Sequence, residues 1–274
     1  MTVRTALQQG TSLLEGAGVG VPRLTAEVLL CHALRCERPY LFAHSEQELQ
    51  EVEWLHYGRY LHERMKGKPT QYITRKQEFY GREFRVTPDV LIPRPETEHV
   101  VEAALEVARG AARVLDVGTG SGALAVTLRM ETGAQVWATD ISRAACGVAA
   151  ENSRRIGAAV RVVNANLMSA IGSGTMDLIV SNPPYVPSGD LHGLQREVRD
   201  WEPHVALFAG ASGLEVYERI IADAPRVLRR PGWLVMELGF GSHQHVQVML
   251  KAWDSVRVTP DLAGIPRVIA ARLC

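Results

Sequence analysis

From Ala111 to Cys274, short β-prone runs alternate with longer segments of helical character. Strands are expected at residues 113–117, 135–139, 160–163, 178–181, 233–238, 256–258 and 267–273. Helices are expected near residues 123–130, 143–156, 214–228 and 243–252. Repeated strand–helix units predict a parallel twisted sheet, and the short connection before the last strand predicts an antiparallel hairpin at one edge. We therefore predict an α/β fold with a seven-stranded, mostly parallel sheet.

The chain before this alternation has a different character, which predicts three domains or segments. Residues 1–70 read as a small helical bundle, in which Pro22 opens the second helix. Ser45 and Glu48 have capping-box spacing, so the fourth helix is expected to run from about residue 46 to 65. Residues 71–92 are β-prone around a Tyr80-Gly81 turn and predict a β-hairpin linker. Residues 93–274 would then form the main domain.

Composition excludes several classes of protein. The formal net charge is zero, which disfavours bulk, sequence-independent binding of nucleic acid. The 4 cysteines are scattered without a C-x-x-C pair, and no H-E-x-x-H occurs, so we expect reduced thiols and no metal site. No apolar run reaches the roughly 18 residues that span a bilayer, and the N-terminus lacks a signal-peptide core. A cytoplasmic protein without membrane association is expected.

A glycine-rich loop follows the first strand of the main domain. The loop reads Asp116-Val117-Gly118-Thr119-Gly120-Ser121-Gly122, and the second strand ends in Asp140. Glycines let the backbone approach a ligand, and a carboxylate at the next strand end accepts both hydroxyls of a ribose. The loop is also a loose variant of a dinucleotide fingerprint. At the third strand end, Asn166 is a candidate hydrogen-bond partner for an adenine edge and Leu167 for packing on the ring; a simple polar loop is the alternative. These residues predict a site for a nucleoside cofactor.

The fourth strand leads into Ser181-Asn182-Pro183-Pro184-Tyr185. Two prolines lack the N–H groups that a central strand requires, so the strand should stop at Asn182. The Asn182 side-chain oxygen and the carbonyls of Asn182 and Pro183 then form a cluster of acceptors beside an aromatic ring. Such a cluster suits a planar –NH2 group, whereas the alternative interpretation is an ordinary turn. If the first and fourth strands are neighbours, the cofactor loop and this motif face the same crevice.

These motifs together resemble the class I, Rossmann-like S-adenosylmethionine-dependent methyltransferases that modify planar nitrogens. The wider pattern resembles the peptide chain release factor glutamine N5-methyltransferases, the PrmC/HemK family, over essentially the whole chain. The segments that carry this resemblance are Gly67-Lys68-Pro69-x-Gln71-Tyr72, Phe79-Tyr80-Gly81, Ile92-Pro93-Arg94-Pro95-Glu96-Thr97-Glu98, Glu202-Pro203 and Asp261-Leu262-Ala263-Gly264. One departure is Asn166, where the family commonly has Asp, followed by Leu167 where an aromatic is frequent.

The resemblance implies methylation of the glutamine in the Gly-Gly-Gln motif of bacterial class I release factors, which modulates translation termination. S-adenosylmethionine would be the cofactor and S-adenosylhomocysteine its product. Asn182, Pro183 and Tyr185 would be catalytic, and Pro184 would join them in binding the substrate. Gly118, Thr119, Gly120, Ser121, Gly122, Asp140, Asn166, Leu167 and Asn182 would bind the cofactor. Arg94 and Thr97 are further candidates, Arg94 either as a ligand contact or as the partner of a carboxylate.

Two other functions are compatible with parts of the pattern. A nucleic-acid amino-methyltransferase acting on adenine N6, cytosine N4 or guanine N2 would use the same Asn182 chemistry, but the zero net charge argues against it. A nucleotide-dependent dehydrogenase would use only the glycine loop and would not need the acceptors at Asn182. The partner that the resemblance implies is a release factor, and we expect the N-terminal helices to dock it.

Overall fold

The computed structural model describes residues 1–274, which divide into two compact units. The first unit comprises Met1–Arg75 with Gln195–Trp201, and the second comprises Lys76–Leu194 with Glu202–Cys274. Each unit contains buried apolar clusters of its own. None of the helices has both the length and the apolar character needed to cross a membrane.

The first unit is a bundle of short helices, as the sequence predicts. Its elements are α1 (Val3–Gly16), α2 (Pro22–Leu34), α3 (Arg38–Ala43), α4 (Glu51–Met65), α5 (Thr70–Thr74) and α9 (Arg196–Trp201). Pro22 does open α2. The apolar faces of α1, α2 and α4 form one core with Leu14, Leu29, Leu30, Tyr57 and Leu61 fully or almost fully buried.

The predicted start of the fourth helix is wrong. Helix α4 begins at Glu51 because Gln50 and Glu53 form its capping box, in which the Gln50 backbone N–H donates to the Glu53 carboxylate at 2.8 Å. Glu48 instead pairs with Thr2 in an isolated antiparallel bridge. The polar residues around 45–50 thus connect α3 and α4 rather than belonging to a helix.

The predicted hairpin is present but shorter than expected. Strands β1 (Lys76–Phe79) and β2 (Arg82–Arg85) pair in antiparallel fashion around the Tyr80-Gly81 turn. Tyr72 and Ile73, which we assigned to the hairpin, lie in α5 and are buried at 2% and 6% exposure. Their β propensity is overridden because burial in the helical core contributes more than local preference.

The second unit is built on a seven-stranded sheet of order β10-β11-β9-β6-β3-β4-β5. All neighbouring pairs from β9 to β5 are parallel, and β11 is antiparallel to β9 and to β10, so the predicted fold class and edge hairpin are confirmed. The strands are β3 (Arg113–Val117), β4 (Gln135–Asp140), β5 (Val160–Asn164), β6 (Met176–Ser181), β9 (Leu228–Glu237), β10 (Asp254–Pro260) and β11 (Pro266–Leu273). Strand order reverses between β3 and β6.

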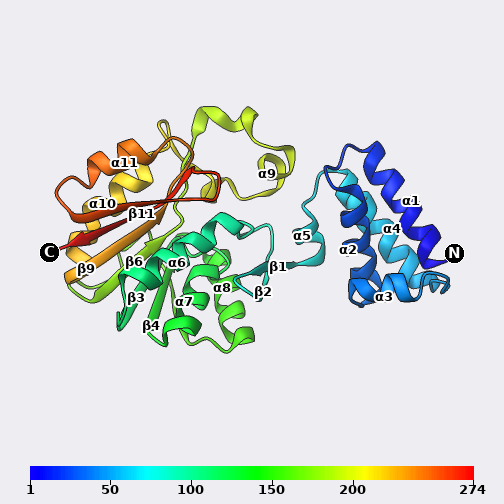
Figure 1. The fold of residues 1–274 in the computed structure, drawn as a ribbon, viewed down its shortest axis with the longest axis horizontal. Coiled ribbons are helices and arrows are strands. Elements are labelled where there is room, and N and C mark those ends of the chain that lie inside the picture. Colours follow the sequence, from blue (N-terminus) through cyan, green and yellow to red (C-terminus); the bar gives the residue numbers. More distant parts are fainter. The chain divides into compact units, whose positions relative to one another are not determined.

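Helices cover both faces of this sheet. They are η1 (Pro95–Thr97), α6 (Glu98–Val107), α7 (Ala123–Thr132), α8 (Arg143–Ile156), α10 (Glu215–Val227) and α11 (His243–Met249). Figure 1 shows α6, α7 and α8 on one face and α10 and α11 on the other. The chain between β6 and α10 also forms β7 (Val186–Pro187), η2 (Ser188–Gly193), η3 (His204–Ala206) and β8 (Phe208–Gly210), none of which we predicted.

Helix α9 interrupts this last stretch and packs in the first unit. The Arg64 guanidinium contacts the Glu197 carboxylate at 2.8 Å, and Arg196 donates to the Lys66 carbonyl at 3.2 Å. The Lys68 ammonium lies 5.7 Å from the centre of the Trp201 ring. These polar and cation–π contacts hold a segment that follows the Asn182 motif in the chain.

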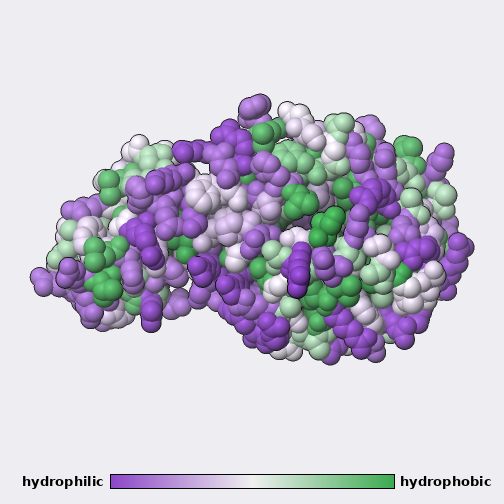
Figure 2. All heavy atoms as spheres, turned by 180° about the vertical axis from the view of Figure 1, so that it is seen from behind, coloured by the Kyte–Doolittle hydropathy of each residue, from purple (hydrophilic) through white to green (hydrophobic).

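The surface is mixed in polarity. Hydrophilic and hydrophobic side chains are interspersed over the face that Figure 2 shows. The most exposed large apolar side chains are Leu55, Val21 and Phe42 in the first unit, and Leu262, Phe240 and Val248 in the second. Isolated apolar side chains of this kind are normal on a protein surface.

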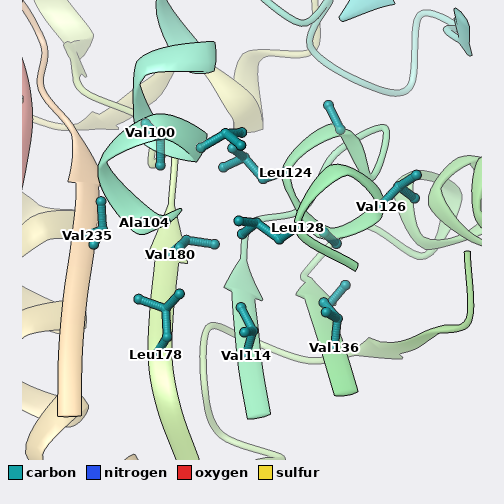
Figure 3. Packing of buried hydrophobic residues seen from close by; sticks show 14 of the residues in the cluster. Val100, Ala104, Val114, Leu124, Val126, Leu128, Val136, Leu178, Val180 and Val235 are labelled. Carbon is teal, nitrogen blue, oxygen red and sulfur yellow. The ribbon is translucent and has the colours of Figure 1, made fainter. Parts of the chain in front are cut away.

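The sheet's alternation divides its side chains between two cores. Val114 and Leu178 face the cluster beneath α6 and α7, whereas their neighbours Leu115 and Ile179 face the cluster beneath α10 and α11. Figure 3 shows the first cluster, with side chains from α6 and α7 gathered over those of the strands. Burial on both faces fixes the register of the strands, and with it the positions of the loops at their carboxyl ends.

Candidate active site

The carboxyl ends of β3 and β6 meet at one cavity. Because the two strands are parallel neighbours, the glycine loop and the Asn182 motif leave the sheet side by side. The Ser181 hydroxyl donates to the Val117 carbonyl at 2.7 Å and ties the two strand ends together. A cavity of about 300 Å³ lies beyond them, and residues from both loops line it. This is the switch point at which an open parallel sheet binds its ligands.

The glycines of the loop have two different tasks. Gly118 and Gly120 line the cavity, have φ of 74° and 54°, and have only open space where a Cβ would lie. Gly122 does not line the cavity, although we grouped it with the cofactor residues. A Cβ on Gly122 would lie 3.2 Å from the Cα of Ala149, so this glycine permits α7 to approach α8. The first two glycines therefore leave room for a ligand.

Asp116 supplies a buried carboxylate at the base of the cavity. Its Oδ2 accepts from the Thr119 hydroxyl at 2.6 Å and from the Ala125 backbone N–H at 3.2 Å. Its Oδ1 is buried and has no hydrogen-bond partner in the protein. Burial raises the pKa of Asp116 to about 7, and the nearby Asp140 adds to the rise. Asp116 lines the cavity, and a buried carboxylate oxygen without a partner calls for a donor. Ser121, also in this loop, lines the cavity and is buried.

Asp140 ends β4 and lines the same cavity. Its two oxygens accept from the backbone N–H groups of Gly120 and Ser142, at 2.9 and 2.8 Å. Burial raises its pKa, and these two hydrogen bonds oppose the rise. The side chain is thus held in a fixed orientation at the edge of the glycine loop.

Asn166 and Leu167 also line the cavity, after β5. The Asn166 Oδ1 accepts from the Arg219 guanidinium at 2.7 Å. Leu167 has φ of 50°, an uncommon conformation for a residue with a Cβ. The polar contact to Arg219 is a feature that the sequence alone did not indicate.

Within the protein, only the nitrogen of the Asn182 side-chain amide makes a hydrogen bond. Its Nδ2 donates to the Thr97 hydroxyl at 3.0 Å, and no hydrogen bond of the protein engages its Oδ1. The Thr97 hydroxyl in turn donates to the Glu237 carboxylate at 2.5 Å. Asn182 and Thr97 line the cavity, whereas Glu237 does not. The arrangement leaves the Asn182 oxygen available as an acceptor.

The rest of the Asn182 motif differs in its access to the cavity. Pro184 lines it, Pro183 is buried, and neither Pro183 nor Tyr185 is among the lining residues. The Tyr185 ring packs on Gly239, where an added Cβ would come within 2.7 Å of the ring. Burial raises the pKa of Tyr185 to about 12, so its hydroxyl stays neutral near pH 7.

Arg94 is engaged by a carboxylate. Its guanidinium contacts the almost fully buried Glu202 at 2.5 Å, and it does not line the cavity. Of the two interpretations that the sequence left open, the structure favours an ion pair over a direct ligand contact.

Sequence reasoning missed Glu237 and Arg219. Glu237 ends an apolar strand, as Asp140 does, so the rule that selected Asp140 would also have selected Glu237. Arg219 lies in the middle of α10, and nothing in its local sequence indicates that it reaches Asn166.

Comparison with known proteins identifies the family. Residues 5–74 match the model of the PrmC N-terminal domain, and residues 98–195 match that of the methyltransferase small domain. A release factor glutamine methyltransferase of Koribacter versatilis is 45% identical over 99% of both chains. The chain belongs to the release factor glutamine methyltransferase family. Further members of this family are 42% identical in Nitratidesulfovibrio vulgaris, over 99% of this chain and 95% of the relative, and 40% identical in Bacillus subtilis, over 98% and 97%.

Solved structures agree with this family's fold. A methyltransferase from Pyrococcus furiosus superposes with a TM-score of 0.54 at 19% identity, over 71% of this chain and 90% of that one. The Thermus thermophilus 16S rRNA methyltransferase in complex with AdoMet and guanosine has a TM-score of 0.54 at 20% identity, over 73% and 50%. At this level of identity the likeness establishes a shared methyltransferase fold.

Proposed function

We propose that this protein transfers a methyl group from S-adenosylmethionine to the side-chain amide nitrogen of the Gly-Gly-Gln glutamine in bacterial class I release factors. Membership of the release factor glutamine methyltransferase family supports the reaction. The observation that carries it at the site is the free Asn182 Oδ1, which shares a cavity with the glycine loop. Modulation of translation termination in the cytoplasm would follow from this substrate.

The residues present fit S-adenosylmethionine. Asp116 offers an unpartnered buried carboxylate oxygen, and Gly118 and Gly120 leave their Cβ positions open. Asp140 stands at the next strand end, where a ribose is bound in folds of this type. When bound, the cofactor supplies a methyl group activated by a sulfonium, and S-adenosylhomocysteine is its product. Thr119, Ser121, Asn166 and Leu167 would complete the cofactor's surroundings.

Asn182 and Pro183 would hold the substrate amide. The lone pair of an amide nitrogen is delocalised, which makes this atom a poor nucleophile. Accepting its two N–H bonds at the Asn182 Oδ1 and the Pro183 carbonyl orients the nitrogen toward the methyl group. The same acceptors stabilise the positive charge that develops on nitrogen, as an oxyanion hole does with opposite sign. As the nitrogen–carbon bond forms, the carbon–sulfur bond breaks and one amide proton passes to solvent. Pro184, which lines the cavity, would limit the position of the amide plane, and Tyr185, whose ring packs on Gly239, would hold the motif in place.

The first unit would dock the release factor. A single glutamine side chain offers too little surface for selective recognition, so further contacts are needed. Leu55, Val21 and Phe42 expose apolar surface on this unit. The zero formal net charge favours a protein substrate over nucleic acid.

A methyl-transfer assay tests this function. The protein would be incubated with methyl-labelled S-adenosylmethionine and, separately, intact release factor, release factor with the Gly-Gly-Gln glutamine replaced by alanine, DNA and RNA. We expect label on the intact release factor alone. Label on the alanine variant would mean that a residue other than this glutamine is methylated. Label on DNA or RNA would favour a nucleic-acid amino-methyltransferase.

A further inference from the structure

A buried chain of hydrogen bonds runs from Glu237 to the proposed catalytic amide. The Glu237 carboxylate accepts from the Thr97 hydroxyl at 2.5 Å, and the Thr97 oxygen accepts from the Asn182 Nδ2 at 3.0 Å. Glu237 and Thr97 are only 3% and 4% exposed. The three residues come from the end of β9, from η1 and from the loop after β6, so the fold brings together distant parts of the sequence.

The direction of this chain follows from the number of protons available. A carboxylate has no proton to donate, so the single hydroxyl proton of Thr97 is used for Glu237. Only lone pairs of the Thr97 oxygen then remain for Asn182. The Asn182 amide must therefore turn its –NH2 group toward Thr97, and its Oδ1 is left to accept from a ligand.

A protonated Glu237 removes this constraint. A carboxylic acid can donate to Thr97, and the Thr97 hydroxyl proton is then free to point at Asn182. The amide can rotate so that Oδ1 accepts from Thr97, which turns the –NH2 group to where the acceptor had been. The –NH2 group of Asn182 would then face the N–H groups of the substrate amide. Both are hydrogen-bond donors, so no hydrogen bond could form between them.

We propose that Glu237, acting through Thr97, is a positioning residue that keeps the Asn182 amide in its acceptor orientation. This inference rests on the proposed function, since it deepens the role of Asn182 in that reaction. Glu237 does not line the cavity, and its side chain reaches Asn182 only through the Thr97 hydroxyl. Its influence is on the orientation of Asn182 and not on binding of the cofactor.

The surroundings of Glu237 place its titration near neutrality. Burial raises the pKa of Glu237 to about 7, while the Thr97 hydrogen bond opposes the rise. Among the charged groups around it, Glu96 raises this pKa, and Arg267 on β11 and Arg94 lower it. Tyr185 and Tyr217 also lie nearby; the Tyr217 hydroxyl donates to the backbone carbonyl of Glu237 at 2.9 Å and leaves the carboxylate to Thr97.

The test combines kinetics on intact release factor with a substrate-free readout. For the wild type, kcat should rise with pH through about 7 as Glu237 ionises. Glu237→Gln keeps the shape of the side chain but can donate, so kcat should fall about ten- to a hundredfold and lose this pH dependence. Thr97→Val should behave alike, whereas Thr97→Ser, which keeps the hydroxyl, should stay within about threefold of the wild type. Calorimetric affinity for S-adenosylmethionine should change less than about threefold in all three variants.

A matched control separates orientation from general loss of packing. Thr127 on α7 is fully buried and its hydroxyl has no hydrogen-bond partner, so Thr127→Val should leave kcat unchanged. If Glu237→Gln does not fold, the comparison of Thr97→Val with Thr97→Ser still tests the positioning role. Wild-type kcat and pH profile in Thr97→Val would overturn the proposal.

NMR provides the readout that is independent of turnover. The side-chain ¹⁵N resonances of Asn182 in the wild type without substrate should shift with pH around 7, and Glu237→Gln should abolish that shift. Asn182 resonances that do not shift with pH in the wild type and are the same in Glu237→Gln would refute the positioning role. If the wild type fails to methylate a release factor but the resonances shift as expected, the proposed function falls and the positioning role remains.

Discussion

At the scale of single residues, the proposed reaction depends on the Oδ1 of Asn182 as an acceptor for the substrate amide. Asn182→Ala removes that acceptor, and removal of one such group in other enzymes costs about 10²–10³ in kcat. We expect a loss of this size in release-factor methylation, with cofactor affinity little changed because the glycine loop and Asp116 are intact. Turnover and calorimetry measure the two quantities. Normal turnover by the variant would remove Asn182 from the mechanism.

Gly120 gives a second prediction at this scale. Gly120→Ala adds a methyl group to the open space of the cavity, so it should weaken binding of S-adenosylmethionine in calorimetry at least tenfold, equal to about 1.4 kcal/mol. It should also lower stability by roughly 1–2 kcal/mol, since φ is positive there.

Gly110→Ala is the matched control for the strain. Gly110 has φ of 82° and open space around its Cβ position, but it lies outside the cavity. It should share the loss of stability and keep cofactor affinity. Equal affinities of the two variants would mean that the cofactor does not approach Gly120.

Functional residues that end strands are predictable from the sequence, whereas those that act across the fold are not. Asp140 and Asn182 follow apolar runs, and both line the cavity as expected. Thr97 entered only through its motif, and its bond to Glu237 joins positions 140 residues apart in the chain. A contact between such distant positions is set by tertiary packing, which no local pattern describes.

At the scale of elements, the strands and helices of the sheet were largely predictable. β3 and α8 have the predicted bounds, because their apolar periodicity agrees with their burial. Predictions failed where capping or burial overrode local preference, as at Glu51 and Tyr72. Helix α9 was missed because its short polar sequence is held by Arg64 and Lys68 rather than by an apolar face.

Helix α9 gives a prediction of its own. The Arg64 side chain is 12% exposed and pairs with Glu197, so Arg64→Ala should leave this carboxylate without its partner and loosen Gln195–Trp201. Limited digestion with trypsin should then cut faster after Arg196 and Arg199. Arg59→Ala is the control, because Arg59 is 62% exposed and lies 4.0 Å from its partner Glu63. Equal cutting rates in the two variants would show that Arg64 does not hold α9.

At the scale of the whole molecule, the parallel sheet with its edge hairpin follows from general rules and the division into units does not. Right-handed crossovers and neighbouring strands make the parallel sheet a strong expectation from the strand–helix alternation. The inclusion of Gln195–Trp201 in the first unit depends on individual ion pairs and on one aromatic ring. The pattern of the sequence therefore specifies the architecture, whereas side-chain contacts decide which segment belongs to which unit.

The free energy of unfolding should depend on pH because Asp116 is buried. Burial raises its pKa from 3.8 to about 7, so between these values the folded protein binds a proton that the unfolded chain has released. Stability from this site is therefore fully present below about pH 4 and is lost as pH rises to about 7. Asp116→Asn cannot ionise, and the unfolding free energy of the variant minus that of the wild type should increase over this interval. Each pKa unit corresponds to about 1.4 kcal/mol, so the increase should reach a few kcal/mol.

Urea unfolding of both proteins at several pH values between 4 and 8 measures this difference. Subtracting the two curves cancels the other carboxylates that both proteins share, such as Asp200 and Asp261, whose pKa values are lowered by arginine partners. A difference that stays flat from pH 4 to 7 would mean that Asp116 is ionised throughout this range in the folded protein. The Asp116 carboxylate, which lines the cavity, would then be negatively charged over this whole interval. An increase that levels off above pH 7 would show instead that this carboxyl group stays neutral in the folded protein until the pH approaches 7.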